Sequence, residues 1–156
     1  MTISAASPLE HSVALWFHHL GLAVSAPEEA CRMLAALGYR HGRTVFDPYQ
    51  LVNLSMWHHD AMPDVEVIWP GPEPGPIDRL VRRSGPLVYH LCYTCTDVDA
   101  TISALETAGL RLVLVRPPAP APLFDGRMVS FHAVDGFGLI ELLEAERQGA
   151  SAAVNQ

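Results

Sequence analysis

The chain contains an internal repeat, and this repeat constrains the fold more than any other feature of the sequence. The segment HLGLAVSAPEEACRMLAALGYR, which begins at His19, aligns without gaps to HLCYTCTDVDATISALETAGLR, which begins at His90. Gly38 then matches Gly109, so the order of apolar and turn residues is the same in both segments. Two copies of one supersecondary unit are therefore expected.

Each copy predicts a strand, a helix and three further strands. An apolar strand-like run is followed by Ser25 or Thr96, either of which can cap a helix, and the helix ends at a glycine. Strand-like segments follow at 40–46, 49–57 and 65–69, and again at 111–117, 127–134 and 139–145. The sequence thus predicts an α+β chain with βαβββ modules at 15–70 and 86–146, a Pro/Gly linker at 71–85, and tails at 1–14 and 147–156. The Pro-rich segment 116–126 is expected to be a loop that borders an open site.

Length and charge limit the class of protein. A chain of 156 residues suits one compact domain, and its formal net charge of −7, with no lysine, would repel a nucleic acid. No apolar segment is long enough to span a bilayer, and the N-terminus lacks the pattern of a secretory signal. The three cysteines do not suggest a disulfide framework. We expect a cytoplasmic protein with neither a nucleic-acid nor a membrane partner.

Ionisable residues recur at matching places in the two copies. His19 and His90 start the repeat, while Glu66 and Glu141 each lie inside an otherwise apolar last strand. A single histidine or glutamate of this kind is commonly satisfied by the core or by solvent. Burying two carboxylates at symmetric positions is costly unless they are paired or bind a metal. Two imidazoles and two carboxylates suit one divalent ion of Mn, Fe, Co, Ni or Zn, so we predict His19, Glu66, His90 and Glu141 as its ligands.

The neighbouring His18 is expected to point away from this site. Successive residues of a strand face opposite sides, so His18 and His19 should not share a face. The repeat singles out His19, because its counterpart is His90 whereas the counterpart of His18 is Tyr89.

The motifs HLGLAV, VEVIWP, YHLCYTCTDVDATI and GFGLIELLE resemble those of the vicinal oxygen chelate superfamily, over roughly residues 15–146. Among its members they look most like methylmalonyl-CoA epimerase and glyoxalase I. The resemblance implies the glyoxalase/bleomycin resistance fold, in which two βαβββ modules form a half-open cup around one divalent ion. His19, Glu66, His90 and Glu141 match the ligand positions. It also implies that the substrate loses a proton α to a carbonyl, through an enediolate, with Glu141 as the base.

The resemblance also implies a second proton-transfer group. The epimerase pattern has a glutamate where this sequence has Tyr49, while Asp47 and Gln50 would fit only in a shifted register. Asn53 and Ser55 are expected to share the face of Tyr49 and to line a substrate pocket. His132 ends a strand and is expected to reach the rim of the cup.

These observations favour a metal-dependent isomerase (epimerase) that acts on a small carbonyl metabolite. Two alternatives stay open: a glyoxalase I-type lyase that acts on a thiol adduct, and a metal-free binding or resistance protein that sequesters a small molecule. Relatives cover their sheet edges by pairing, so the resemblance also implies a homodimer, with Trp16 and Trp69 as candidates for the covered surface.

Overall fold

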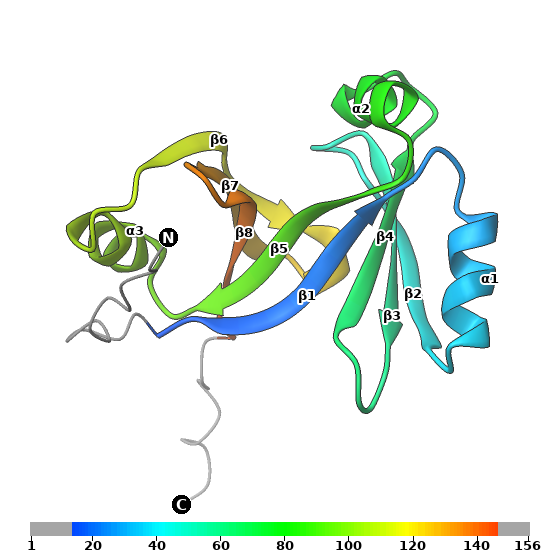
Figure 1. Ribbon diagram of the computed structural model, residues 1–156, viewed down its shortest axis with the longest axis horizontal. Coiled ribbons are helices and arrows are strands. Elements are labelled where there is room, and N and C mark those ends of the chain that lie inside the picture. The colour runs from blue at the N-terminus through cyan, green and yellow to red at the C-terminus, as the bar shows by residue number, and fades with distance from the viewer. Residues whose placement is uncertain (1–13, 147–156) are drawn as a thin grey trace, which may run out of the picture.

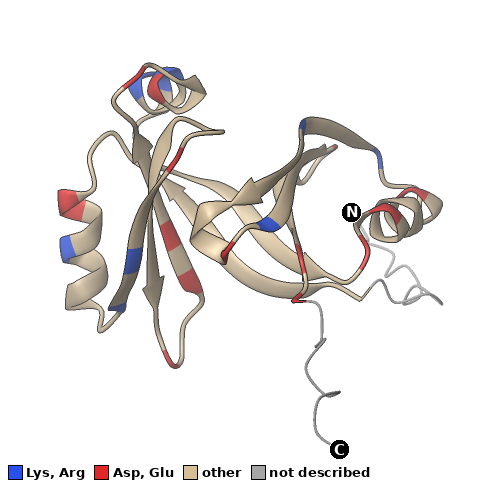
Figure 2. Ribbon diagram, turned by 180° about the vertical axis from the view of Figure 1, so that it is seen from behind, with Lys and Arg blue, Asp and Glu red and all other residues tan. Residues whose placement is uncertain are grey.

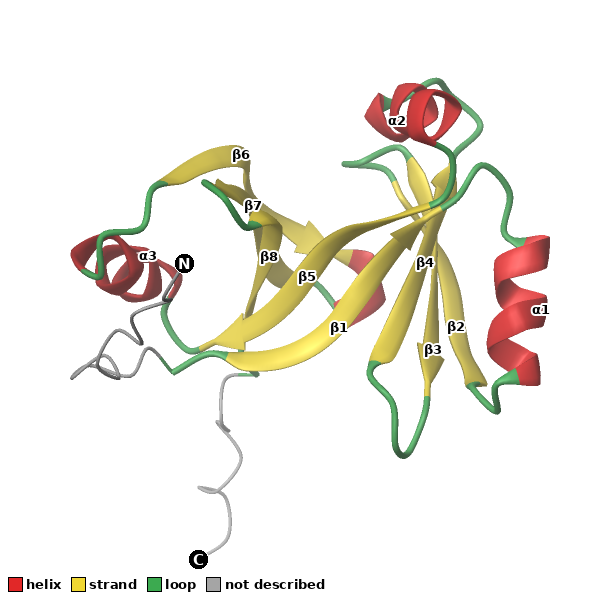
Figure 3. Ribbon diagram, in the orientation of Figure 1, coloured by secondary structure: helices red, strands yellow, loops and turns green. Residues whose placement is uncertain are grey.

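The protein forms one continuous curled sheet, in which the same order of elements occurs twice (Figures 1 and 3). The computed structural model describes residues 14–146. The elements are β1 (Trp16–Ala23), α1 (Glu28–Ala36), β2 (Arg40–Asp47), β3 (Val52–His58), β4 (Asp64–Pro70), α2 (Pro76–Ser84), β5 (Leu87–Cys95), α3 (Val98–Thr107), β6 (Leu112–Ala121), the short 3₁₀ helix η1 (Pro122–Phe124), β7 (Arg127–Val134) and β8 (Gly138–Glu144). The α+β fold with two βαβββ units and a half-barrel sheet is thereby confirmed.

The first strand of each unit lies at the centre of the sheet. The strand order is β2-β3-β4-β1-β5-β8-β7-β6, with β1 antiparallel to β5. Each central strand is also parallel to the last strand of its own unit, β1 to β4 and β5 to β8. In Figure 1 the long β1 and β5 run side by side and join the two curled halves. The two strands that carry the repeated histidines are therefore adjacent, and the strands that carry the glutamates flank them.

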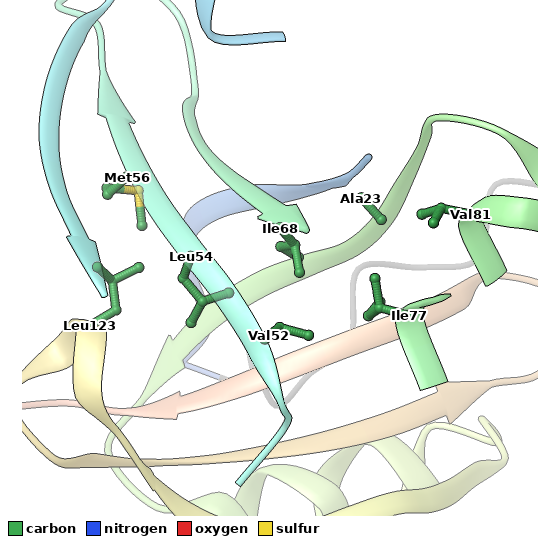
Figure 4. Close-up of a cluster of buried hydrophobic side chains, with 8 residues drawn as sticks. All are labelled: Ala23, Val52, Leu54, Met56, Ile68, Ile77, Val81 and Leu123. Carbon is green, nitrogen blue, oxygen red and sulfur yellow. The ribbon is translucent and has the colours of Figure 1, made fainter. Parts of the chain in front are cut away.

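The two faces of the sheet are covered differently. One outer cluster packs residues of α1 against the sheet and includes Val24, Leu34, Trp57, Val65 and Val67. A second outer cluster packs residues of α3 against Cys95, Val134, Ile140 and Leu142. The concave face holds Ala23, Val52, Leu54, Met56, Ile68 and Leu123, shown in Figure 4.

Helix α2 closes one end of this concave face. Its residues Ile77 and Val81 are buried and point toward Ala23 and Ile68 (Figure 4). The segment 71–85, expected to be a Pro/Gly linker, thus contains a 9-residue helix that contributes to the core. Burial of two branched side chains stabilises this position by about 3 to 6 kcal/mol relative to exposure.

Strand β3 begins later than expected. The carboxylate of Asp47 accepts hydrogen bonds from the backbone N–H groups of Tyr49 and Gln50, and these bonds fold the chain into a turn. Leu51 completes the turn with a positive φ of 58°. Tyr49 therefore lies in the turn between β2 and β3, not on a strand.

The Pro-rich segment also differs from expectation, because β6 continues through it to Ala121. Proline cannot donate a ladder hydrogen bond, but β6 is an edge strand that pairs only with β7. Its pairing is irregular near Arg116, where the prolines begin.

The helix starts differ as well. No side chain caps α1, and α3 is capped by Asp97, whose carboxylate accepts a hydrogen bond from the N–H of Ala100. The caps expected at Ser25 and Thr96 are therefore wrong.

Charged residues lie mainly outside the strands. Figure 2 shows charges of both signs on α1 and α2, whereas most of the strand ribbon carries none. Among residues 14–146, no helix is both long and apolar enough to cross a membrane. A carboxylate buried on the concave face of the sheet costs free energy unless it is hydrogen-bonded, paired with a cation or bound to a metal.

Candidate metal centre

The pairing of the four central strands brings the repeated histidines and glutamates together. Residues directly opposite each other on neighbouring strands project from the same face of a sheet. Two such rows cross the middle of the concave face. The rows are Glu66–Gly21–His90, across β4, β1 and β5, and His19–Cys92–Glu141, across β1, β5 and β8.

Gly21 gives the imidazole of His90 room to lie across β1. A Cβ atom at position 21 would be only 2.3 Å from Cε1 of His90. The second copy differs here, because the counterpart of Gly21 is Cys92, a buried free cysteine. The site is thus symmetric in its ionisable groups and asymmetric in the residues between them.

The Nε2 atoms of the two histidines lie close to each other and to both carboxylates. Nε2 of His19 lies 3.7 Å from Oε2 of Glu66 and 3.4 Å from Oε2 of Glu141. Nε2 of His90 lies 3.6 Å and 3.3 Å from the same two oxygens, and the two Nε2 atoms are 3.3 Å apart. Tetrahedral ligands at about 2.1 Å from an ion are about 3.4 Å from one another. All four side chains are buried.

Burial shifts the protonation of the two carboxyl groups in opposite directions. Burial and the charge of Glu141 raise the pKa of Glu66 to about 8. Burial acts on Glu141 in the same sense, but His90 and His19 outweigh it and lower its pKa to about 2. Burial also lowers the pKa of His19, which favours the neutral imidazole that a metal requires.

One carboxylate oxygen of the site has no hydrogen-bond partner among the described residues, and a bound cation would satisfy it. Oε2 of Glu141 is buried without a hydrogen-bond partner among the described residues. An unsatisfied buried acceptor costs about 1 to 3 kcal/mol, and more when it is charged. The buried group of His19, Glu66 and His90 could hold a metal ion. The position of Glu141 beside both imidazoles suits a fourth donor.

Two residues expected to line the pocket lie on the opposite face of the sheet. Met56 is paired with Glu66, so Ser55 and Asn53 alternate away from the concave face toward α1. The side-chain amide of Asn53 donates to the backbone carbonyl of Pro70 at 2.9 Å. The expectation that Asn53 and Ser55 line the cup is wrong, because it placed Tyr49 and these residues on one strand.

His132 also faces outward. It is paired with Ile140, whereas Phe131 is the residue opposite Glu141. His132 lies within hydrogen-bond distance of Ser130 on the same face, with Nε2 3.0 Å from the hydroxyl oxygen. The concave position belongs to Phe131, whose ring centroid is 5.4 Å from that of His90. Phe131 could have been identified from the sequence only if the register between β7 and β8 were known, because that register places Phe131 opposite Glu141.

Tyr49 and the two tryptophans named from the sequence, Trp16 and Trp69, are not part of this group of ionisable side chains. Tyr49 is 57% exposed, and its backbone carbonyl accepts a hydrogen bond from Arg116 at 2.8 Å. The structure does not place Tyr49 among the four donors, and its role in proton transfer stays a prediction. Of the two tryptophans, Trp69 packs in the cluster under α1, whereas Trp16 is 56% exposed.

His18 is a residue of the site that the sequence did not indicate. The β1–β5 register shifts between Phe17 and His19, which leaves His18 in a β-bulge. Its Nδ1 lies 2.8 Å from Nδ1 of His19, so the expectation that the two rings face opposite sides is wrong. His18 also lines a pocket of about 400 Å³ together with Met56 and Phe124.

Comparisons with known proteins agree with this architecture. No curated protein sequence matches the chain. The crystal structure of methylmalonyl-CoA epimerase from Mycobacterium tuberculosis is similar with a TM-score of 0.72 and 21% identity, covering 91% of this chain and 96% of that one. A hypothetical protein from Bacillus halodurans gives a TM-score of 0.70 at 18% identity, with coverages of 87% and 98%. Methylmalonyl-CoA epimerase from Streptomyces coelicolor gives 0.65 at 18%, with coverages of 84% and 97%.

A family model matches most of the chain directly. The match runs over residues 18–131, which include His19, Glu66 and His90 and stop short of Glu141. With the duplicated fold and the buried histidine–glutamate group, it shows that the chain belongs to the Glyoxalase/Bleomycin resistance protein/Dioxygenase superfamily.

Proposed function

We propose that this protein is a divalent-metal-dependent isomerase that removes a proton α to the carbonyl of a small metabolite. The observation that carries the proposal is that Nε2 of both His19 and His90 lies within 3.7 Å of the carboxylates of both Glu66 and Glu141. Oε2 of Glu141 has no hydrogen-bond partner among the described residues. A divalent ion held by these residues would act as a Lewis acid on a substrate carbonyl and increase the acidity of the adjacent C–H bond.

The residues of the chain supply the proton transfer in this proposal. The imidazoles of His90 and His19 keep Glu141 ionised, so it would receive the substrate proton, whereas burial raises the pKa of Glu66 to about 8 and favours its protonated form in the metal-free protein. Such a separation of two carboxyl groups is typical of acid–base sites. Apolar residues of the concave wall, Leu54, Met56, Leu123 and Phe124, would exclude water from the transfer.

Epimerisation requires that a proton be delivered to the opposite face of the planar enediolate. Tyr49 is the proposed partner for a two-base route. Because its side chain is largely exposed, that route requires the turn between β2 and β3 to move toward the site. A one-base route, in which Glu141 returns the proton, requires the substrate to turn instead.

The similar structures suggest the first substrate class to test. The Streptomyces coelicolor epimerase is described in complex with 2-nitronate-propionyl-CoA, and another epimerase structure in complex with methylmalonyl-CoA. We therefore propose acyl thioesters, and small hydroxylated carbonyl compounds, as candidate substrates.

Solvent-deuterium exchange tests the proposal. Protein purified without added metal would first be analysed for its metal content and then incubated in D₂O with each candidate, with and without a chelator. We expect deuterium at the α-carbon that depends on the metal. Glu141→Gln should lower the exchange rate by roughly 10²- to 10⁴-fold, the scale of losing a general base. Exchange that persists without metal would contradict the proposal.

The same experiment separates the alternatives. A lyase would release or form a thiol adduct of a carbonyl compound, which is measured by adding the thiol to the assay. A sequestering protein would bind a small molecule with no exchange and no turnover.

A further inference from the structure

A bulge precedes each of the two repeated histidines, and the two bulges carry different residues. The pairing of β1 with β5 leaves His18 unpaired before His19, and it leaves Tyr89 unpaired before His90. Positions 18 and 89 are equivalent in the repeat. The fold therefore presents two matched places beside the metal ligands, with an imidazole at one and a phenol at the other.

Only the first of these residues bonds to its histidine. Nδ1 of His18 is 2.8 Å from Nδ1 of His19, a hydrogen-bond distance. By contrast, Nδ1 of His90 is buried without a hydrogen-bond partner among residues 14–146, and Tyr89 meets the His90 ring only edge-on at 5.5 Å. The two histidines thus differ at Nδ1, the ring nitrogen that points away from the carboxylates. In His19 this atom has a hydrogen-bond partner, and in His90 it has none among the described residues.

The geometry fixes the direction of this hydrogen bond once a metal is bound. Nε2 of His19 faces the three other donor groups, so it must offer a lone pair to the ion. A neutral imidazole then carries its proton on Nδ1, which donates to Nδ1 of His18. His18 must therefore accept at Nδ1 and carry its own proton on Nε2, on the other side of its ring.

Phe124 holds the pair in this orientation. Its ring packs edge-on against His18 at 5.2 Å and lies over His19 at 5.4 Å. The two imidazoles are themselves perpendicular, with centroids 5.0 Å apart. The rings of His18 from β1 and Phe124 from η1 thus limit the rotation of His19 about its side-chain bonds.

We propose that His18 is a positioning residue that fixes the tautomer and orientation of the metal ligand His19 and thereby raises the metal affinity of the site. This inference rests on the proposed function, because it requires that the site binds a divalent ion. Partners of the outer nitrogen of a ligating histidine are usually carboxylates, backbone carbonyls or water, and their loss typically weakens metal binding 10- to 100-fold. Here the partner is a second imidazole.

A different use of His18 is less consistent with the distances. His18, His19 and Cys92 are also close enough together to be considered as ligands of an ion. However, tetrahedral ligands would be about 3.4 Å apart, and the 2.8 Å between the two Nδ1 atoms is shorter and fits a hydrogen bond.

Zinc affinity measured by competition with a chromophoric chelator tests the proposal without any substrate. His18→Phe keeps a ring but removes the acceptor, so its affinity for Zn²⁺ should fall by roughly 10- to 100-fold. His18→Asn places an acceptor oxygen near the Nδ1 position, so this variant should keep most of the zinc affinity of the wild type. Tyr89→Phe, the matched change in the second copy, should leave the affinity unchanged.

Nitrogen-15 NMR of the zinc-loaded protein gives a second, independent readout. We expect an unprotonated Nδ1 and a protonated Nε2 on His18. A proton on Nδ1 of His18, or equal zinc affinity of the wild type and His18→Phe, would overturn the inference while leaving the proposed metal site intact. If the wild-type protein binds no zinc and no other divalent ion, the proposed function itself fails.

Discussion

Gly21 shows how one missing methyl group shapes the site. It lies between Glu66 and His90 in a row across three strands, and the His90 ring occupies the space that a Cβ atom would take. The His90 ring is buried and packed against Phe131, so it has little freedom to move away.

Gly21→Ala should therefore displace His90 and weaken metal binding. Overpacking of this kind also costs about 1 to 3 kcal/mol of the free energy of unfolding. Zinc competition and urea denaturation would measure the two effects. Gly75→Ala is a matched control, because a Cβ there meets its nearest neighbour at an ordinary 3.5 Å. Unchanged zinc affinity in Gly21→Ala would contradict the close approach of His90.

The protonation of Glu66 predicts how the stability of the metal-free protein depends on pH. Its pKa is about 8 when folded, against an ordinary value of 4.5, so the folded state binds this proton more tightly than the unfolded state does. That contribution to stability is complete below pH 4.5 and is lost as the pH rises through 8. The lowered pKa of His18, about 4, has the opposite effect but acts only below about pH 6.5.

Between pH 6.5 and 8 the free energy of unfolding of the chelator-treated protein should therefore fall, by at most about 1.4 kcal/mol per pH unit. Urea denaturation at several pH values would measure this slope. Glu66→Gln removes the titrating group and should flatten the curve in the same window. A wild-type slope that is flat or positive would show that Glu66 is ionised in the folded metal-free protein.

At the scale of elements, local pattern and repetition were sufficient to predict the central strands and the faces they present. The offset between the two copies identified the strands of His19 and His90. Leu20 and Leu22, which alternate with His19 and Gly21 along β1, pack on the α1 side. The bulges at His18 and Tyr89 could not be predicted, because a bulge is defined by the partner strand. The start of β3 was missed because a side chain, that of Asp47, organises the turn before it.

The turn between β2 and β3 provides a test of this explanation. Asp47 is buried and accepts three hydrogen bonds, from the N–H groups of Tyr49 and Gln50 and from the Gln50 side chain. Asp47→Ala would leave these donors unpaired and should lower the free energy of unfolding by about 2 to 4 kcal/mol. Asp47→Asn keeps an acceptor and should cost less.

The control for this change is an exposed ion pair at the other end of β2. Asp60 pairs with Arg40 in solvent, so Asp60→Ala should lower the free energy of unfolding much less than Asp47→Ala does. Equal costs for Asp47→Ala and Asp60→Ala in urea denaturation would mean that Asp47 does not organise the turn.

One edge of the curled sheet exposes apolar side chains. Strand β6 forms one edge, and its residues Val113, Leu114 and Val115 are all exposed, although successive residues of a strand face opposite sides. Trp16 and Val88, on the two central strands, are exposed as well. Exposed apolar edge strands promote association with other chains unless they are covered.

Association into a homodimer would cover such a surface, and the dimer stays a prediction that light scattering can test. At micromolar concentration a dimer of 17.0 kDa chains should give twice that mass. If β6 contributes to the contact, Leu114→Glu should shift the equilibrium toward the monomer, because a charge would be buried in an apolar contact. Leu110→Glu, at an exposed position before β6, is the control and should leave the mass unchanged. A dimer that persists in Leu114→Glu would place the contact on another part of the sheet, with Trp16 as the next position to change. A wild-type mass of a single chain would exclude the dimer at that concentration.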